Sequence, residues 1–591
     1  MKISDYVVQF LVEKGINKAF VITGGCIVHM IDSISKNSKI DYVAMRHEQA
    51  GAMAADGYAR VNDGVGLAMA TSGPGATNLL TGVLCSYYDS IPLIIITGQV
   101  PSSHLKRNSK TRQIGFQETD VISIYETATK YCVLIDNPKT IKYELQKAFY
   151  LANNGRPGPV LLDICDDVQR ADINPDELTE FIPNSEQLVN VELTSKINDL
   201  INMINESIRP VFIYGNGIRL SNSIKESIQL AEQLGIPIVP TWAGLDYLPH
   251  NHELVVGCFG VSSGRAGNFT VQNSDLIITV GTRLDTHETG PILESFTREA
   301  KRVMVDIDKA EIEKFKERNY NIDLPICADA RDFFRLMLEN ISTVDKIKWV
   351  DWIKIINEYK GKYPICLPEY EKQKKKVNPY YFMDCLSNKL KEGDIIFSDC
   401  GGNLIWTMQG IKPKKNQRII SAFNHSPMGY AVPASIGAAF ASNKEIFCIT
   451  GDGGLQMNVQ ELATIEKHNL PIKIILFNNH GHGIIRNTLE TWLEGNYQAT
   501  TPESGLPDPN YIKIAEAYGL KTISMNSHNE IPEKMDYLFS CSGPLLCNVE
   551  LLPSQKMIPK LTYGKPIEDP EPLLPRNEFN ENMIIKPFSK K

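Results

Sequence analysis

Two short segments in the last third of the chain carry the oxygen ligands that a magnesium ion prefers in proteins. The first, Ile446–Gly454, ends in a glycine-rich turn around Asp452, and the second, Ile474–Asn479, ends in Asn479. Each leaves the carboxyl end of a predicted strand, which is where open α/β sheets bind ligands. The turn around Asp452 alone is more often an ordinary tight turn, but Asn479 behind the next strand favours a shared site. A carbonyl of the turn His480–Gly483, two diphosphate oxygens and a water would complete octahedral Mg²⁺ coordination. The glycines that would let the backbone approach a phosphate are Gly451 and Gly453.

A second candidate group is the carboxyl of Glu48, which opens a predicted helix of small residues. The small residues are Ala50, Gly51, Ala52, Ala54 and Ala55. An isolated glutamate on a helix is usually solvated. Here we expect the small side chains to pack closely and to remove Glu48 from water. A carboxyl buried in this way is protonated more readily and can hydrogen-bond strongly to a ring nitrogen of a cofactor.

Short apolar, β-branched runs alternate with amphipathic stretches along almost the whole chain. Such runs are typical of parallel strands that are buried on both faces, with helices between them. They fall into three groups, which predicts an α/β fold of three parallel-sheet domains. The groups are Phe20–Thr23, Leu67–Ala70, Leu93–Thr97 and Val160–Ile164; Val211–Tyr214, Ile236–Val239, Leu276–Val280 and Val303–Val305; and Ile395–Ser398, Ile446–Thr450, Ile472–Phe477 and Leu545–Val549.

The composition excludes several classes of protein. The chain has 591 residues, of which 43% are hydrophobic and 22% charged, as in a multidomain globular protein. A formal charge of −8 provides no broad phosphate-binding surface, so nucleic acid is not an expected partner. No apolar run approaches the roughly 20 residues of a membrane helix. The 12 scattered cysteines are typical of reduced thiols, so we expect a cytoplasmic protein without membrane contact.

Two polar segments and the end of the chain mark the predicted domain limits. Asp172–Glu186 is dotted with prolines, and Tyr359–Asn378 contains a run of lysines that we interpret as a solvated linker rather than as a site for an anionic partner. After Pro553 the chain becomes proline-rich and loses its periodicity, which predicts an extended tail over the surface or over a cleft. The predicted units are residues 1–170, 187–345 and 376–552, followed by a tail at 553–591.

Several segments, in this order, resemble the large subunits of acetolactate synthases, a family of thiamine-diphosphate enzymes. They are Ala70–Asn78, Asp89–Gln99, Gly115–Asp120, Gly155–Asp163 and Pro509–Gly519, and the spacing of Asp452 and Asn479 resembles the thiamine-diphosphate motif. The resemblance covers roughly residues 1–552. It implies that the three predicted domains are, in order, a pyrimidine-binding domain, a central domain and a diphosphate-binding domain.

The resemblance assigns catalytic roles to three residues and a wedge role to a fourth. Glu48 matches the glutamate that binds N1′ of the aminopyrimidine ring and promotes removal of the C2 proton of the thiazolium. Met428 matches the bulky side chain that bends the cofactor so that its two rings meet. Phe116 and Gln117 match residues on the substrate side of the site.

Further positions of the cofactor site follow from the same resemblance. It names Asp452, Asn479 and the carbonyl of Gly481 as the metal ligands. The remaining cofactor-binding positions that it implies are Gly25, Thr71, Gly401, Gly402, Gly451, Gly453 and Gly454. Beside Gly25 the chain departs from the family, since Thr23 replaces a proline and Cys26 an alanine.

The implied reaction is the decarboxylation of pyruvate and the transfer of its two-carbon unit to a second 2-keto acid, which gives 2-acetolactate and CO₂. The implied cofactors are thiamine diphosphate and Mg²⁺. In the family the active site forms between two subunits, so a homodimer or homotetramer is expected. The resemblance leaves open a regulatory small subunit as a further partner.

The central segment resembles the FAD domain of the family. The candidate FAD-binding residues are Gly215, Gly217, Arg283 and Asp306. Gly215 and Gly217 supply only two glycines of a dinucleotide signal, and flavin has no redox role in acetolactate synthesis. FAD is therefore left open as a third cofactor.

Recognition of the acceptor is where the chain departs most from the family. His287 stands where the family has an arginine that binds the carboxylate of the second keto acid, and Thr488 stands where many members have a tryptophan that selects the acceptor. Arg283, His287 and Arg486 are candidates for binding a carboxylate, or they are ordinary surface and loop residues. Two alternatives therefore stay open: a related thiamine-dependent transferase with an aldehyde or keto-sugar acceptor, and a 2-keto acid decarboxylase.

Overall fold

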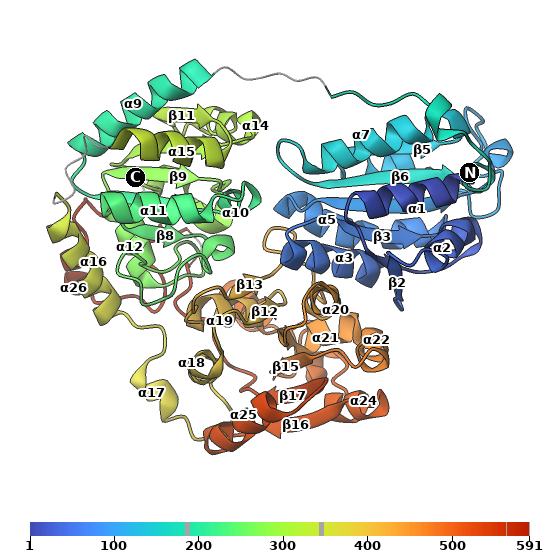
Figure 1. Cartoon of the computed structure of the whole chain (residues 1–591). Helices are drawn as coiled ribbons and strands as arrows, with labels where there is room; N and C mark the ends of the chain where they lie inside the picture. Colours follow the sequence, from blue (N-terminus) through green and yellow to red (C-terminus); the bar gives the residue numbers. More distant parts are fainter. Residues whose placement is uncertain (184–189, 342–347, 563, 590–591) are drawn as a thin grey trace.

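The computed structural model describes residues 1–183, 190–341, 348–562 and 564–589. Within them the chain forms three α/β units, each built on one parallel sheet (Figure 1). The sheets have six, five and six strands. The predicted fold class, three parallel-sheet α/β domains, is confirmed.

The first unit, blue in Figure 1, has the strand order β2-β1-β3-β4-β6-β5. Its strands are β1 (Lys18–Val21), β2 (Asp41–Ala44), β3 (Gly66–Ala70), β4 (Leu93–Gln99), β5 (Tyr131–Ile135) and β6 (Pro159–Cys165). Its helices are α1 (Ile3–Glu13), α2 (Val28–Ser35), α3 (Glu48–Asn62), α4 (Pro74–Asn78), α5 (Leu80–Asp89), α6 (Val121–Tyr125), α7 (Ile141–Asn153) and α8 (Asp166–Gln169). The order reverses between β1 and β3, and such a switch point opens a crevice for ligands.

The central unit has the order β11-β10-β9-β7-β8. Its strands are β7 (Pro210–Tyr214), β8 (Ile238–Pro240), β9 (Leu276–Val280), β10 (Lys301–Asp306) and β11 (Leu324–Cys327). Its helices are α9 (Asn190–Glu206), α10 (Gly217–Leu220), α11 (Ile224–Leu234), α12 (Arg265–Asn273), α13 (Thr286–Thr289), α14 (Lys309–Glu313), α15 (Ala330–Asn340) and α16 (Val350–Lys362).

The third unit has the order β13-β12-β14-β15-β17-β16, with its switch point between β12 and β14. Its strands are β12 (Ile395–Ser398), β13 (Arg418–Ile420), β14 (Ile446–Gly451), β15 (Ile472–Asn478), β16 (Lys521–Met525) and β17 (Leu545–Glu550). Its helices, with the linker helix α17, are α17 (Pro368–Glu371), α18 (Pro379–Lys389), α19 (Gly402–Gly410), α20 (Ala431–Ala441), α21 (Asp452–Met457), α22 (Leu462–Lys467), α23 (Gly483–Trp492), α24 (Tyr511–Ala517) and α25 (Ile531–Ser540).

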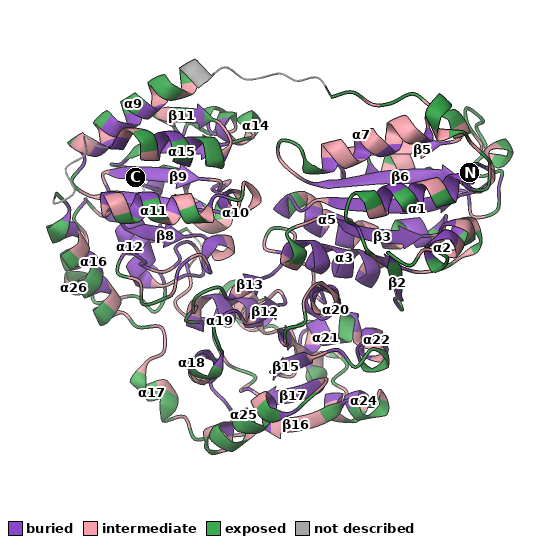
Figure 2. Cartoon of the chain, viewed as in Figure 1, coloured by how far each residue is buried: buried purple, intermediate pink, exposed green. Residues whose placement is uncertain are grey.

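Helices α3 and α20 join the first and third units along a fully buried seam (Figure 2). At the closest points of this seam only glycine fits. A methyl group on Gly57 would lie 2.1 Å from the Ala434 carbonyl oxygen, and one on Gly437 would lie 1.8 Å from that of Ala54. The small residues of α3 therefore serve the approach of a neighbouring helix.

The predicted limits of the central domain, residues 187 and 345, lie outside the described residues. Beyond the second of them, Trp352 of α16 is buried in the core of the central unit, so that core includes residues after the polar segment. The tail crosses to the same core, where it buries Ile567 and Phe579. The tail also carries helix α26 (Arg576–Asn582), and its side chains pack against apolar residues of the central unit.

None of the helices in the described part of the chain has the length and apolar character needed to cross a membrane.

Candidate active site

Asp452 and Gly481 meet at the carboxyl ends of β14 and β15. The carboxylate of Asp452 accepts the main-chain N–H of Gly481 at 2.7 Å and that of Gly453 at 2.7 Å. Burial raises the pKa of Asp452, and these two hydrogen bonds oppose the shift. Gly481 has φ +142°, and a methyl group there would lie 2.2 Å from the Thr500 carbonyl oxygen. The turn thus requires glycine at this position.

Asn479 lies beside the same turn. With its amide oriented to satisfy both neighbours, its nitrogen donates to the Gly481 carbonyl at 2.7 Å and its oxygen accepts from Arg486 at 3.3 Å. One carboxylate, one amide and one carbonyl are therefore gathered at one place, with Asp452 as the charged member. Within the described residues, no group of three or more His, Cys, Asp and Glu side chains could hold a metal on its own. A donor set with one carboxylate suits Mg²⁺ that is shared with a phosphate ligand.

Met428 lies against the glycine-rich turn. A methyl group on Gly453 would lie 2.7 Å from Met428 Cε. The following residue, Gly429, donates its N–H to the buried carboxylate of Asp399 at 3.0 Å. Burial raises the pKa of Asp399 to about 6. The loop that carries Met428 is thus tied to the end of β12, next to the switch point.

Gly401 and Gly402 begin α19 on the other side of that switch point. Asn403 connects this loop to β14, since a methyl group on Gly451 would lie 3.1 Å from Asn403 Oδ1. The tail reaches the same loop, where a methyl group on Gly402 would lie 3.4 Å from Met557 Sδ. The sequence-predicted glycines of these loops therefore lie near the switch point between β12 and β14.

His480 is a site residue that sequence reasoning missed. Its ring contacts Asp508 through Nδ1 at 2.8 Å and Glu550 through Nε2 at 3.0 Å. These two carboxylates raise the pKa of His480 to about 9 against the opposing effect of burial. The two contacts of the imidazole therefore fix the position of the turn between Asn479 and Gly481. The only signal in the sequence was that His480 stands between two predicted metal ligands, Asn479 and Gly481. Its partners Asp508 and Glu550 lie on distant segments.

A second cluster forms at the switch point of the first unit. Thr71 follows β3, and its hydroxyl accepts the N–H of Cys26 at 3.2 Å. Gly25 stands beside this contact, and nothing lies within 4 Å of a methyl group built on it. The Cys26 thiol accepts the hydroxyl of Ser72 at 3.3 Å. The structure thus brings Gly25 and Thr71 together, with open space at Gly25.

Phe116 and Gln117 lie on a loop next to this cluster. Phe116 is 86% exposed, and Gln117 has φ +63° and lies 3.0 Å, through its carbonyl oxygen, from a methyl group built on Gly73. The loop is ordered by Glu118, whose carboxylate accepts the N–H groups of Lys106, Ile114 and Gly115. The loop therefore holds a large apolar ring in solvent.

Glu48 is the first residue of α3, and its carboxylate accepts the side-chain amide of Asn78 at 2.9 Å. It is half-buried in this chain, so its small neighbours cover it only in part. Those neighbours pack against other elements instead: Ala54 lies against Gly437 of α20, and Ala52 against Gly82 of α5. The carboxyl therefore remains open to a ligand or to another subunit.

The candidate acceptor residues do not converge in this chain. The ring of His287 packs on Trp242 with centroids 4.2 Å apart, and Arg486 donates to the main-chain oxygen of Asn479 at 2.8 Å. Thr488 donates to a carbonyl of its own helix and lines a separate cleft between α23 and the tail. Arg283 lies in the central unit, at the pocket described next.

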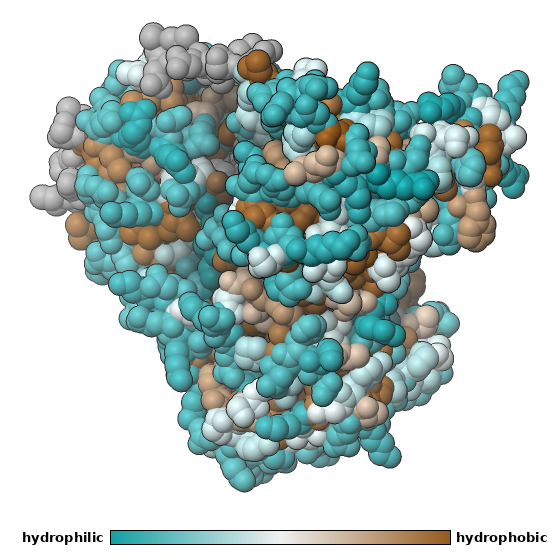
Figure 3. All heavy atoms as spheres, turned by 45° about the vertical axis from the view of Figure 1, so that its right-hand side comes forward, coloured by the Kyte–Doolittle hydropathy of each residue, from teal (hydrophilic) through white to brown (hydrophobic). Residues whose placement is uncertain are grey.

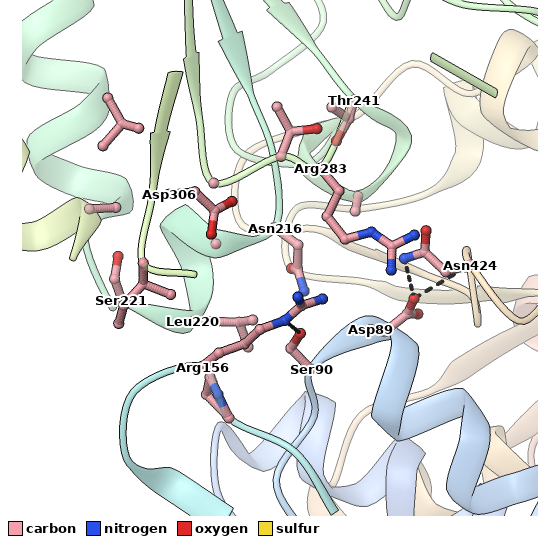
Figure 4. Close-up of a pocket in the computed structure, with 18 of the residues that line it drawn as sticks. Asp89, Ser90, Arg156, Asn216, Leu220, Ser221, Thr241, Arg283, Asp306 and Asn424 are labelled. Atoms are coloured by element: carbon pink, nitrogen blue, oxygen red, sulfur yellow. Dashed lines mark hydrogen bonds between the residues drawn. The ribbon is translucent and has the colours of Figure 1, made fainter. Parts of the chain in front are cut away.

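Three of the candidate FAD residues, Gly217, Arg283 and Asp306, line a pocket of about 920 Å³, including its open mouth, between the central and first units (Figure 4). Asp306 ends β10 in it, and burial raises the pKa of this carboxyl to about 6. Gly215 and Gly217 belong to the pocket region, but their missing side chains admit the backbone of Gly281 (2.3 and 2.6 Å) rather than a ligand. The glycine pair is therefore explained by packing.

Arg156 is a second residue that the sequence did not reveal. It enters this pocket from the first unit and donates to Ser90 at 2.8 Å (Figure 4). It also pairs with Asp308 at 3.0 Å and Glu311 at 2.8 Å. Arg283 faces the pocket from the central unit. Two guanidinium groups and the Asp306 carboxyl thus line one cavity between two domains.

Comparisons with known proteins agree with this geometry. Residues 1–124 match the N-terminal thiamine pyrophosphate-binding domain of thiamine pyrophosphate enzymes, residues 197–337 match the central domain, and residues 399–549 match the C-terminal thiamine pyrophosphate-binding domain. The two clusters described above lie in the first and third of these regions.

Several relatives match this chain over most of its length. The chain is 33% identical to a probable acetolactate synthase large subunit of Methanocaldococcus jannaschii, over 99% of both chains. It is 33% identical to acetolactate synthase 3 of Brassica napus, over 96% of this chain and 86% of that protein. It is 34% identical to the acetolactate synthase large subunit of Corynebacterium glutamicum, over 89% and 82%. The chain therefore belongs to the thiamine pyrophosphate enzymes, within the family of acetolactate synthase large subunits.

Proposed function

We propose that this chain condenses two molecules of pyruvate to 2-acetolactate and CO₂ with thiamine diphosphate and Mg²⁺. The observation that carries the proposal is the identity of 33% over 99% of both chains with a probable acetolactate synthase large subunit, in a chain that keeps both ligand clusters. A bound thiamine diphosphate would supply the electron sink for loss of CO₂ and the nucleophilic carbon for the acceptor carbonyl. Everything else in the reaction is the task of the chain's own residues.

In this proposal Asp452, Asn479 and the Gly481 carbonyl hold Mg²⁺ and, through it, the diphosphate. The fit is supported by the donor set, in which one buried carboxylate, one side-chain amide and one carbonyl meet at a single turn. The glycine-rich turn leaves room for phosphate oxygens, and Met428 stands beside it to hold the bend of the cofactor.

The carboxyl of Glu48 is proposed to form a hydrogen bond with the ring nitrogen N1′ of the aminopyrimidine and so to promote loss of the C2 proton. Asn78 orients the carboxyl by its hydrogen bond of 2.9 Å. Gln117 and Phe116 face the substrate side, where Phe116 excludes water from the reacting carbons.

We propose that the two clusters belong to active sites shared between two copies of the chain. Glu48 is half-open to solvent, and large apolar side chains are exposed beside both clusters. These include Phe116 (86%), Met457 (54%) and Ile485 (46%). Figure 3 shows apolar atoms interrupting the hydrophilic surface across the middle of one face. Patches of this kind are typical of subunit interfaces. Because relatives are named large subunits, a small partner subunit is also proposed.

We also propose that the pocket between the first and central units binds FAD through its adenosine diphosphate part. The Asp306 carboxyl can accept ribose hydroxyls, and Arg156 and Arg283 supply positive charge for the diphosphate. We expect denaturation of the purified protein to release flavin, and an Asp306→Ala variant to retain at least about tenfold less, the scale of one lost charge-assisted hydrogen bond.

The control for the flavin prediction is Asp332→Ala, since Asp332 is an exposed aspartate of the neighbouring helix α15 with a side chain 55% exposed. This variant is expected to retain flavin like the unaltered protein. A purified protein that neither contains flavin nor takes it up from solution would contradict the assignment.

A second candidate function keeps the same cofactor but uses another acceptor, an aldehyde or a keto-sugar. The observation in its favour is the place of His287, whose ring packs on Trp242 where the family has an acceptor-binding arginine. Arg486 does not replace that arginine, because it is buried against the turn at Asn479. A 2-keto acid decarboxylase has no comparable observation in its support.

Product analysis separates these functions. Labelled pyruvate alone is expected to give labelled 2-acetolactate and CO₂ at a rate of about 1–10³ per second, as enzymes do with their own substrates. This rate should lie within about tenfold of the rate with any other acceptor, tested as a panel of keto acids, aldehydes and keto-sugars. Slow acetolactate formation that accelerates strongly with an aldehyde or keto-sugar would replace the synthase by the second candidate. Free acetaldehyde as the main product would indicate a decarboxylase.

A further inference from the structure

A single buried side chain, Glu461, connects the third unit to the turn that precedes Glu48. Glu461 ends the short helical turn Val459–Glu461, which follows α21, and it is fully buried. One carboxylate oxygen accepts the main-chain N–H of Arg46 at 3.0 Å, and the other accepts the hydroxyl of Thr464 at 2.8 Å. The carboxylate therefore spans two units that are far apart in the sequence.

The electrostatics show what holds this carboxylate. Burial raises the pKa of Glu461, and the Thr464 hydroxyl and the main-chain N–H groups of Arg46 and His47 oppose that shift. A buried carboxylate needs such donors, and the N–H groups would themselves be orphaned without an acceptor. Glu461 thus accepts hydrogen bonds from the backbone of the turn between β2 and α3.

That backbone determines where α3 begins. The first N–H groups of a helix have no partner within it. His47 is the N-cap of α3, and its ring accepts the N–H of Gln49 at 3.2 Å. Glu461 accepts the main-chain N–H groups of Arg46 and His47, which precede Glu48. The start of α3 is therefore fixed both by the His47 ring and by Glu461. Glu48 is the first residue of that turn.

The same segment also holds the loop of Met428. Asn458, three residues before Glu461, is 1% exposed, and its amide donates to the Gly429 carbonyl at 2.7 Å. The residues Asn458–Glu461 therefore contact the backbone next to Met428 and the backbone next to Glu48.

We propose that Glu461 is a positioning residue for Glu48, which it orients through the main chain of Arg46 and His47. The inference rests on the proposed role of Glu48. Because Glu48 and Met428 are proposed to serve different active sites of a dimer, the segment Asn458–Glu461 also links those two sites within one subunit. Glu461 touches neither the cofactor nor the substrate in this proposal.

The test uses the full-length protein and the variants Glu461→Met and Glu461→Gln. Methionine fills the space but accepts no hydrogen bond, whereas the glutamine carbonyl can still accept from Arg46. In the protein without cofactor, Glu461→Met is expected to speed amide hydrogen exchange of residues 46 and 47 at least about tenfold. With thiamine diphosphate and Mg²⁺ bound, it is expected to slow C2 proton exchange at least about tenfold while the dissociation constant of thiamine diphosphate changes less than about threefold.

Glu461→Gln is expected to stay within about threefold of the unaltered protein in both measurements. The matched control is Glu466→Gln, an exposed glutamate of α22, which is expected to change neither. A merely structural role would instead lower cofactor affinity and the unfolding temperature together with C2 exchange.

Normal amide exchange at residues 46 and 47 in Glu461→Met, or normal C2 exchange, overturns the proposal. If that variant does not fold, Thr464→Val replaces it, because it removes the second anchor of the carboxylate. Faster amide exchange at Arg46 is then expected, and an unchanged rate overturns the proposal. Glu48→Gln is measured in parallel: normal C2 exchange there refutes the role of Glu48, whereas loss there with normal exchange in Glu461→Met refutes only the role of Glu461.

Discussion

A Glu48→Gln variant is expected to lose exchange of the thiamine C2 proton by roughly 10²–10⁴-fold, the contribution of a positioned acid–base group. Glutamine has the shape of glutamate, and its amide oxygen can still accept the hydrogen bond that Asn78 donates at 2.9 Å. The first turn of α3 therefore keeps its conformation. What disappears is the carboxyl that shares a proton with the pyrimidine ring. Quenched-flow exchange into deuterated water, read by NMR, measures this rate directly.

The design separates chemistry from binding. Thiamine diphosphate is expected to bind Glu48→Gln with a dissociation constant close to that of the unaltered protein, because the diphosphate is held in the third unit by Asp452 and Asn479. Glu13→Gln, an exposed glutamate at the end of α1, is the matched control and is expected to exchange normally. Near-normal exchange in Glu48→Gln would remove this carboxyl from the mechanism.

The strands that could be predicted from the sequence are all those inside the sheets and one edge strand, β8. The sequence did not indicate β2, β5, β11, β13 and β16, and every one of them is an edge strand. An edge strand has one neighbour and often one open face, so its sequence need not be continuously apolar. β2 shows this, because only Val43 of its four residues is buried. Periodicity therefore identifies the middle of a parallel sheet better than its margins.

The ligand positions of the third unit were predictable for a related reason. Asp452 and Asn479 directly follow β14 and β15, two neighbouring buried strands, so local sequence already places both at one edge of the sheet. His480 was not predictable, because its role depends on Asp508 and Glu550, which belong to a loop and to β17. Arg156 was missed in the same way, since it acts in a pocket of another unit.

The small residues of α3 illustrate a limit of reading burial from composition. A stripe of alanine and glycine predicts close packing on that helix, and α3 is indeed buried along its length. The stripe does not identify the partner. The partners are α20, reached through Gly57 and Gly437, and α5, where Ala52 lies against Gly82. Glu48 lies beyond the end of the contact with α20 and is half-buried.

An Asp452→Ala variant is expected to raise the concentrations of Mg²⁺ and thiamine diphosphate needed for half-saturation by more than the roughly 10–100-fold that changes in the outer shell of a metal site produce. Two effects add. The metal loses its one charged protein ligand, and the N–H groups of Gly453 and Gly481 lose the acceptor that each now meets at 2.7 Å. Both requirements are measured by the quenching of fluorescence, first as the cofactor is titrated at fixed Mg²⁺ and then as Mg²⁺ is titrated at fixed cofactor.

The pattern of effects then identifies the role of Asp452. If the carboxylate binds the metal, saturating Mg²⁺ and cofactor restore much of the rate of Asp452→Ala, because Glu48 and Met428 remain in place to act on a cofactor that is forced to bind. Asp536→Ala is the matched control, since this aspartate lies on α25 with a side chain 66% exposed, and both half-saturation values should stay unchanged. Unaltered titrations in Asp452→Ala would dismiss the metal assignment. A rate that stays low at saturation would place Asp452 in the chemistry rather than in binding.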